Sequence, residues 1–197
     1  RASLAIVKGE SGSGKSTLLR HWLRSRRHEG CLLLSVRCYR QDHTPVRLLN
    51  ALVQELTLAV AGLDEVSWQP LLRQHAREIC QLFPQIQQLL PAASIPSVSK
   101  PSPTTSPESA HDVSLAPFIL WLLEISHYRR LVLCVDDAQW ADADSLRTLK
   151  RLLEHEQGFA GALVLVDESD DDHLRQMFQP PDAFPAERAA PLRPQLN

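Results

Sequence analysis

The sequence predicts an α/β fold in which a mainly parallel β-sheet carries helices on both faces. Three observations lead to this prediction. Short apolar runs recur along the chain, amphipathic segments of helical period lie between them, and a glycine-rich segment follows the first apolar run. The apolar runs lie at residues 4–7, 31–36, 131–135 and 162–166.

The best-defined helix is the second one, because both of its ends carry a signal. Thr44 suits the N-cap, Pro45 suits the first turn, and Gly62 follows the last apolar residue. Between these ends, apolar residues recur at helical spacing: Leu49, Leu52, Val53, Leu56 and Val60.

Other segments have helical periodicity but weaker end signals. They are expected at about residues 16–27, 67–83, 118–125 and 142–153. Two segments are too poor in apolar residues to order themselves: a Pro/Ser-rich insertion at about 91–112, expected to be flexible, and an irregular tail from about 179.

The composition favours a single domain, residues 1–197. A chain of 197 residues with 44% hydrophobic residues can bury one sizeable core but is short for two. Its formal net charge of -2 gives no basic field that would attract nucleic acid or anionic lipid. The scattered cysteines resemble buried thiols of a reducing compartment, so we expect a cytoplasmic location. The chain begins within a strand-like run and has no initiator Met, so we expect a fragment of a longer protein.

The glycine-rich segment at residues 9–17 reads GESGSGKST and matches the pattern G-x-x-x-x-G-K-[ST]. Its glycines allow the backbone N–H groups to turn inward toward phosphate oxygens, and the following helix presents a positive N-terminus. Lys15 can reach the β- and γ-phosphates, and the Ser16 hydroxyl can ligate Mg²⁺. The residues expected to bind the nucleotide are Gly9, Glu10, Ser11, Gly12, Ser13, Gly14, Lys15, Ser16 and Thr17.

An apolar strand at residues 131–135 leads into two carboxylates, Asp136 and Asp137. Asp136 would lie at the carboxyl end of the sheet, where it can hold Mg²⁺ through water. Asp137 is then placed to polarise an attacking water, although a second Asp can equally cap the following turn. Asp137 and Lys15 are the expected catalytic residues, with ATP or ADP and Mg²⁺ as the ligands.

The two motifs together resemble a known group of proteins. GESGSGKSTLL, followed downstream by LVLCVDDAQWADADSL, is similar to the ATPase modules of the STAND class within the AAA-like P-loop proteins. These modules occur in bacterial LuxR-type regulators and in ATPases fused to Ser/Thr protein kinases or cyclases. The segment RCYRQDHTPVRLLNALVQEL is similar to the kinase-fused branch. The resemblance spans roughly residues 3–178.

The resemblance implies a P-loop NTPase three-layer sandwich, here ending before the helical lid. It implies that Asp136 serves Mg²⁺ and that Asp137 is the hydrolytic carboxylate. One departure concerns the segment after residue 166, where such modules commonly place a polar residue and an Arg near the γ-phosphate. This chain has instead an acidic run, Asp167 to Asp172, whose negative charge would repel a triphosphate if it faced the site. We expect a solvated loop that points away from the site.

The favoured function is an ATP-binding, slowly hydrolysing nucleotide switch in a bacterial signalling protein, with neighbouring kinase, cyclase or DNA-binding domains as partners. It involves no membrane and no direct nucleic-acid contact, and homo-oligomers on activation are compatible with it. One alternative is a degenerate nucleotide-binding or docking module without turnover. An ABC-type transport ATPase is disfavoured because no LSGGQ-like segment is present, and a GTPase because no Asn-Lys-x-Asp segment is present.

Overall fold

The computed structural model describes residues 2–26, 30–40, 46–61, 65–89, 115–169 and 171–179. At its centre is a four-stranded parallel sheet with the strand order β1-β4-β3-β2. The strands are β1 (Ser3–Lys8), β2 (Leu32–Arg37), β3 (Leu131–Asp136) and β4 (Gly161–Asp167). Each apolar run in the sequence therefore forms a strand, and the predicted α/β fold is confirmed.

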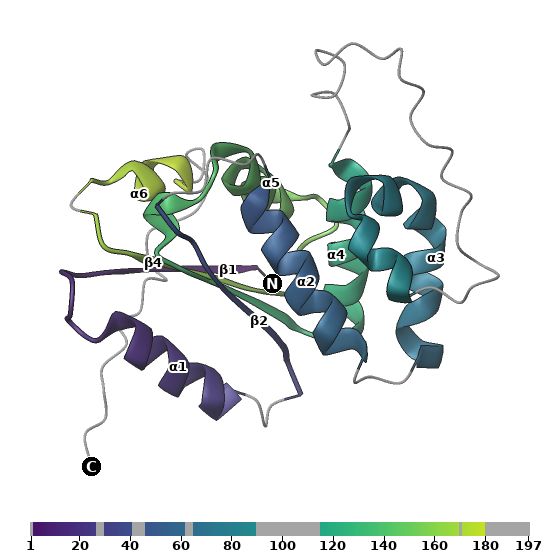
Figure 1. Ribbon diagram of the computed structural model, residues 1–197, viewed down its shortest axis with the longest axis horizontal. Coiled ribbons are helices and arrows are strands. Elements are labelled where there is room, and N and C mark those ends of the chain that lie inside the picture. The colour runs from purple at the N-terminus through teal and green to yellow at the C-terminus, as the bar shows by residue number, and fades with distance from the viewer. Residues whose placement is uncertain are drawn as a thin grey trace, which may run out of the picture.

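Helices cover both faces of this sheet, as predicted (Figure 1). The helix α1 lies below the sheet in the figure, whereas α2, α4 and α5 lie on the opposite side. The helices are α1 (Lys15–Arg26), α2 (Arg47–Ala61), α3 (Glu65–Leu82), α4 (Ala116–Tyr128), α5 (Ala143–Glu154) and α6 (His173–Met177), with short 3₁₀ turns η2 (Pro84–Leu89) and η5 (Ala138–Trp140).

The alternation of side chains along each strand divides the core into two clusters. On β3, Leu131, Leu133 and Val135 belong to the larger cluster with residues of α2, α4 and α5. Val132 and Cys134, on the other face, belong to a smaller cluster with residues of α1. We call the two sides of the sheet the α2 face and the α1 face.

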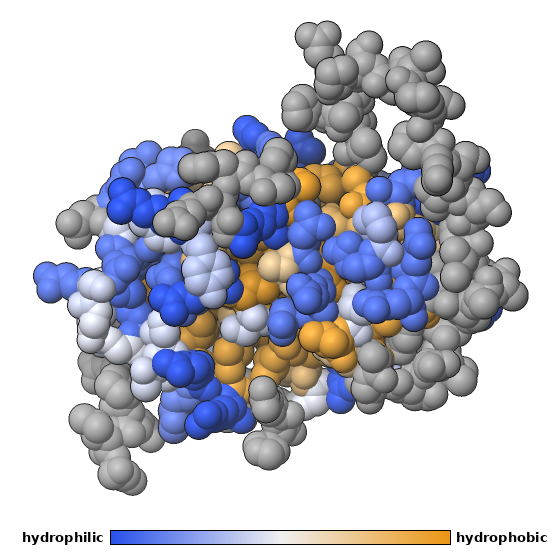
Figure 2. All heavy atoms as spheres, viewed as in Figure 1, coloured by the Kyte–Doolittle hydropathy of each residue, from blue (hydrophilic) through white to orange (hydrophobic). Residues whose placement is uncertain are grey.

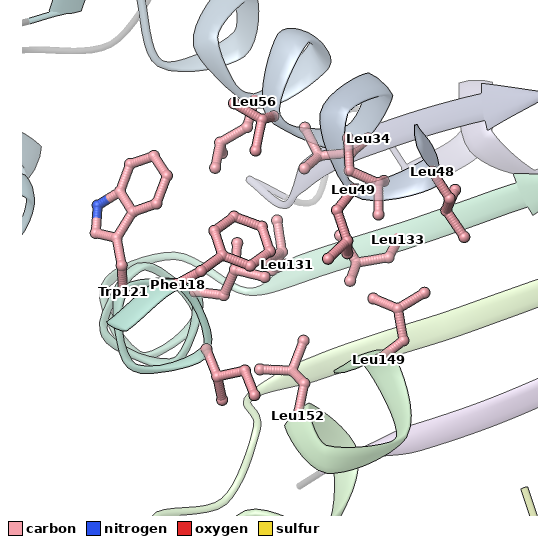
Figure 3. Close-up of a cluster of buried hydrophobic side chains, with 14 of the residues drawn as sticks. Leu34, Leu48, Leu49, Leu56, Phe118, Trp121, Leu131, Leu133, Leu149 and Leu152 are labelled. Atoms are coloured by element: carbon pink, nitrogen blue, oxygen red, sulfur yellow. The ribbon is translucent and has the colours of Figure 1, made fainter. Parts of the chain in front are cut away.

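The α2 face is closely packed (Figure 3). Leucines of α2 and α5 and the aromatic rings of α4 converge on Leu34, Leu131 and Leu133, which are at most 1% exposed. The rings of Phe118 and Trp121 lie with centroids 6.4 Å apart at one end of this cluster. Burial of this many large apolar side chains makes the α2 face the main source of the fold's stability.

Several predicted boundaries differ from the structure by one or two residues. The helix expected from Ser67 begins at Glu65 and ends at Leu82, and a 3₁₀ turn that the sequence did not predict begins at Pro84. Proline ends the α-helix because it lacks an N–H, but the same ring suits the first position of a new turn. Asp142, expected as the first residue of α5, is its N-cap.

The helix α1 presents a narrower apolar stripe than its sequence indicates. Leu19 and Leu23 are buried and Trp22 is half-buried, but Leu18 is 55% exposed. The α1 face therefore rests on few large side chains.

Some predictions fall outside the described residues. These are the residues Thr44, Pro45 and Gly62, the insertion at 91–112 and the tail beyond residue 179. The helix expected to begin at Pro45 begins at Arg47, because Val46 has a φ of 51°, which is not helical. Among the helices that can be described, none is both long enough and apolar enough to cross a bilayer.

Candidate phosphate-binding site

The glycine-rich loop connects the carboxyl end of β1 to the first turn of α1. Gly12 and Gly14 have φ angles of 77° and 87°, in the region that disfavours residues with a Cβ. At Gly9 a Cβ would lie 2.9 Å from Ser13 Oγ, so a larger residue there would displace the Ser13 hydroxyl. The loop conformation therefore depends on the motif's glycines, as the sequence predicts.

The loop leads directly into the helix, so the first amides of α1 face the loop. The Leu18 N–H donates to the Gly14 carbonyl at 2.9 Å and begins the helical ladder. The amides of Lys15, Ser16 and Thr17 precede this first bond and have no partner within the helix. Such an N-terminus favours anions, because unpaired N–H groups and the helix dipole act together.

Lys15 is folded back over the loop. Its Nζ donates to the Gly9 and Glu10 carbonyls at 2.7 Å each, and its side chain is only 9% exposed. The ammonium group is therefore held at the mouth of the loop.

Ser16 and Asp136 meet across the sheet, although 120 residues separate them in the chain. The Ser16 hydroxyl donates to Asp136 Oδ1 at 3.1 Å. Asp136 is the last residue of β3, and β4 lies between β3 and the strand that leads into the loop. Because parallel strands end at the same edge, the sheet brings the hydroxyl of the loop and the first carboxylate together.

The second carboxylate, Asp137, is held by an arginine. Its backbone is left-handed, with a φ of 55°, and its Oδ2 accepts from Arg37 Nε at 2.7 Å. This hydrogen bond, supported by the charge of Asp137, raises the pKa of Arg37. Arg37 ends β2, directly opposite Asp136 in the strand register. The Arg37 side chain is 57% exposed and lines a shallow cleft with Tyr39 and Trp140, whereas the Asp137 side chain is only 15% exposed.

The family model for the AAA ATPase domain matches residues 1–166 of this chain. The chain belongs to that family. Neither a curated protein nor a solved structure gave a significant match. The parallel sheet and the glycine-rich loop are those of a P-loop NTPase, and family membership supports nucleotide binding.

The AAA ATPase domain has residues that fit Mg²⁺ and a polyphosphate. The Ser16 hydroxyl and the Asp136 carboxylate are hard oxygen donors of the kind Mg²⁺ prefers, and they already lie side by side. Within the described residues, no group of three or more His, Cys, Asp or Glu could hold a metal alone. A site with only two protein oxygens fits Mg²⁺, which is usually bound by one or two protein groups together with phosphate oxygens.

The acidic loop after β4 does not point away from the site, and this expectation was wrong. Glu168 Oε1 lies 3.7 Å from Lys15 Nζ, while Lys8 Nζ donates to Asp172 Oδ1 and to the Asp171 carbonyl at 2.7 Å each. The hydrogen bond from Lys8 lowers the pKa of Asp172. Two lysines at the carboxyl edge attract this loop, which explains why it lies beside the site. Hydrophilic residues dominate this end of the molecule, at the left of Figure 2.

The sequence did not single out Arg37, Glu168, Gln139 or Asp142 as contributors. Gln139 Oε1 accepts from the Glu168 N–H at 3.2 Å and so holds the acidic loop beside η5. Asp142 accepts from the amides of Val46, Leu48 and Ser145 and from the Ser145 hydroxyl, and it thereby joins the starts of α2 and α5. The DDAQWAD segment is therefore as much a structural junction as a chemical site.

The remaining loop side chains make no comparable approach to the acidic strand. Glu10, Ser11, Ser13 and Thr17 are exposed at the rim of the loop. The expectation that these residues bind phosphate therefore concerns their backbone amides and not their side chains.

Proposed function

We propose that this domain binds ATP together with Mg²⁺ and hydrolyses it slowly, acting as the nucleotide switch of a bacterial signalling protein. The observation that supports the proposal best is the 3.1 Å contact between the Ser16 hydroxyl and Asp136. Two oxygen donors for one Mg²⁺ thus lie beside a glycine loop and a helix N-terminus that suit phosphates.

In this proposal Lys15 neutralises phosphate charge. Its Nζ now donates to two loop carbonyls, which are neutral acceptors. Phosphate oxygens are charged acceptors and form stronger hydrogen bonds with an ammonium group, so the lysine would turn toward them. Mg²⁺, when bound by Ser16 and Asp136, would withdraw further charge from the phosphates.

Asp137 is the proposed general base, because its carboxylate lies one residue beyond the metal-binding acid. In the present conformation it is paired with Arg37, which competes for the same oxygen atoms. The Arg37 side chain is 57% exposed, so water can solvate it when the pair opens and leaves Asp137, which is 15% exposed, to accept a proton from water.

A second function, nucleotide binding without turnover, is favoured by that same pair. If Arg37 keeps Asp137 engaged, the domain would bind ATP or ADP as a structural ligand or a docking signal and release no phosphate. The AAA ATPase family and the lack of an LSGGQ-like segment both speak against an ABC-type transport ATPase.

Neighbouring domains are the proposed recipients of the signal. A switch of this kind acts by binding its ligand more tightly in one arrangement of its neighbours than in another. The proposed neighbours are kinase, cyclase or DNA-binding domains, on the strength of the resemblance at the two motifs.

Phosphate release from ATP, measured under steady state, separates the two functions. The wild type should release phosphate, and Asp137→Asn should reduce the rate by about 100-fold or more while still binding ATP. Asp144→Asn is the matched control, since it makes the same chemical change at an exposed residue of α5. Binding without release in the wild type would select the non-hydrolysing function.

Competition between GTP and labelled ATP tests the base. We expect ATP to bind at least as tightly as GTP. A clear preference for GTP would reverse the assignment of adenine, and failure of both nucleotides to bind would overturn the proposal.

A further inference from the structure

The described residues of the acidic loop after β4, on either side of position 170, contact residues beside the phosphate-binding loop. At the strand end, Asp167 is fully buried and its Oδ1 accepts from the Ser169 N–H and hydroxyl at 2.9 and 2.7 Å. At the far end, Lys8 binds Asp172 and the Asp171 carbonyl. Residues 167–169 and 171–172 are therefore held in place by contacts that the structure describes.

Between these anchors, Glu168 faces Lys15. Its N–H is held by the Gln139 side chain at 3.2 Å, and its carboxylate lies 3.7 Å from Lys15 Nζ. An ammonium group has three donors. Two of them serve loop carbonyls, which leaves one donor for an anionic partner near the Glu168 carboxylate.

A nucleotide must share Lys15 with this carboxylate. The terminal phosphate of a triphosphate adds negative charge near the lysine, and like charges at close range repel each other. A diphosphate lacks that charge, so it experiences less of the repulsion. The side chain of Glu168 is 35% exposed, and solvent screens the effect to a moderate size.

We propose that Glu168 is a specificity-determining residue of this site: it competes with the terminal phosphate for Lys15 and shifts the preference from the triphosphate toward the diphosphate. The proposal rests on the proposed function, because it assumes that nucleotide phosphates occupy the loop. It assigns to the acidic loop an effect on the choice between ATP and ADP, separate from hydrolysis.

The test is the dissociation constant of ATP and of ADP, each with Mg²⁺, for the whole chain and its variants. Glu168→Gln should tighten ATP by about three- to ten-fold and ADP by clearly less. Asp171→Asn is the matched control: it removes one charge from the same loop at an exposed side chain and should change neither constant by more than about two-fold. Thermal unfolding of both variants should match the wild type.

Each outcome decides the matter. If Glu168→Gln tightens ATP and ADP binding equally, or if Asp171→Asn changes the two dissociation constants as Glu168→Gln does, the effect comes from the loop's overall charge and the proposal is overturned. Weaker ATP binding in Glu168→Gln would mean that the carboxylate helps to hold the metal, which also overturns it. In both cases the wild type still binds nucleotide, so the proposed function stands; a wild type that binds neither nucleotide overturns both.

Discussion

The two faces of the sheet differ in how firmly they are packed. On the α2 face, α4 buries Phe118 and Trp121, each 1% exposed (Figure 3), and Phe83, which follows α3, is fully buried in the same cluster. On the α1 face, a single described helix covers the strands, and its own contacts are Leu19, Leu23 and the half-buried Trp22.

This difference places the proposed phosphate-binding loop on the more weakly packed side of the sheet. The helix that follows the phosphate-binding loop is the one held by the smaller cluster, whereas the acidic strand β3 is packed on both faces. Local contact density sets local stability, so α1 and its loop should open more readily than the helices of the α2 face. A ligand that joins Ser16 to Asp136 would connect the weaker side to the firmer one.

The largest expected effect comes from truncating matched leucines on the two faces. Leu34→Ala on the α2 face should lower the free energy of unfolding by about 2–5 kcal/mol. Leu34 is fully buried, so removing its side chain leaves a cavity among the surrounding leucines. Leu19→Ala on the α1 face should cost less, since Leu19 keeps some exposure and its surroundings can relax. Denaturant unfolding measures both, and equal losses would remove the distinction between the faces.

The next effect concerns the junction at Asp142 on the α2 face. Asp142→Ala should lower the free energy of unfolding by about 1–3 kcal/mol, because it deprives the starts of α2 and α5 of their acceptors. Asp144→Ala is the control two residues away; its exposed pair with Arg147 should be worth less than about 0.5 kcal/mol. Similar losses in the two variants would mean that Asp142 acts only as a surface charge.

Much of this arrangement follows from the sequence, and the reasons are physical. A short apolar run of strand length is best buried in a sheet, so the ends of all four strands were predicted to within two residues. The phosphate loop was predicted because its glycines and its lysine must keep a fixed spacing. The meeting of Ser16 and Asp136 follows from these two facts, since parallel strands share one edge.

Other contacts could not be predicted because they depend on strand order or loop direction. The partner of Asp137 is Arg37, and its choice among the many arginines requires knowing that β2 lies beside β3. Glu168 was expected to face solvent, since the sequence does not say on which side of the strand end the acidic loop turns. Asp142 was assigned to a helix because its partner amides at Val46 and Leu48 are more than 90 residues away.

The smallest expected effect is the rate at which the cysteines are alkylated. Burial raises the pKa of Cys38 and that of Cys134 to about 12. At pH 8, each of these two thiols is therefore ionised in only about one molecule in 10,000. Cys31, half-buried at the rim of the α1 face, should react first with iodoacetamide. Mass spectrometry of the labelled peptides gives the order; early labelling of Cys134 would show that the α1 face opens far more than its packing indicates.

The most direct test of the nucleotide site is the calorimetric affinity of ATP with and without Mg²⁺ for the wild type, Lys15→Ala and Asp136→Asn. If Ser16 and Asp136 share a metal-bound polyphosphate with Lys15, Mg²⁺ should tighten ATP binding in the wild type and have little effect in Asp136→Asn. Lys15→Ala should weaken binding by about 10- to 100-fold, the value of hydrogen bonds to a charged group. Equal affinity with and without Mg²⁺, together with an unchanged Lys15→Ala, would contradict the assignment of this site.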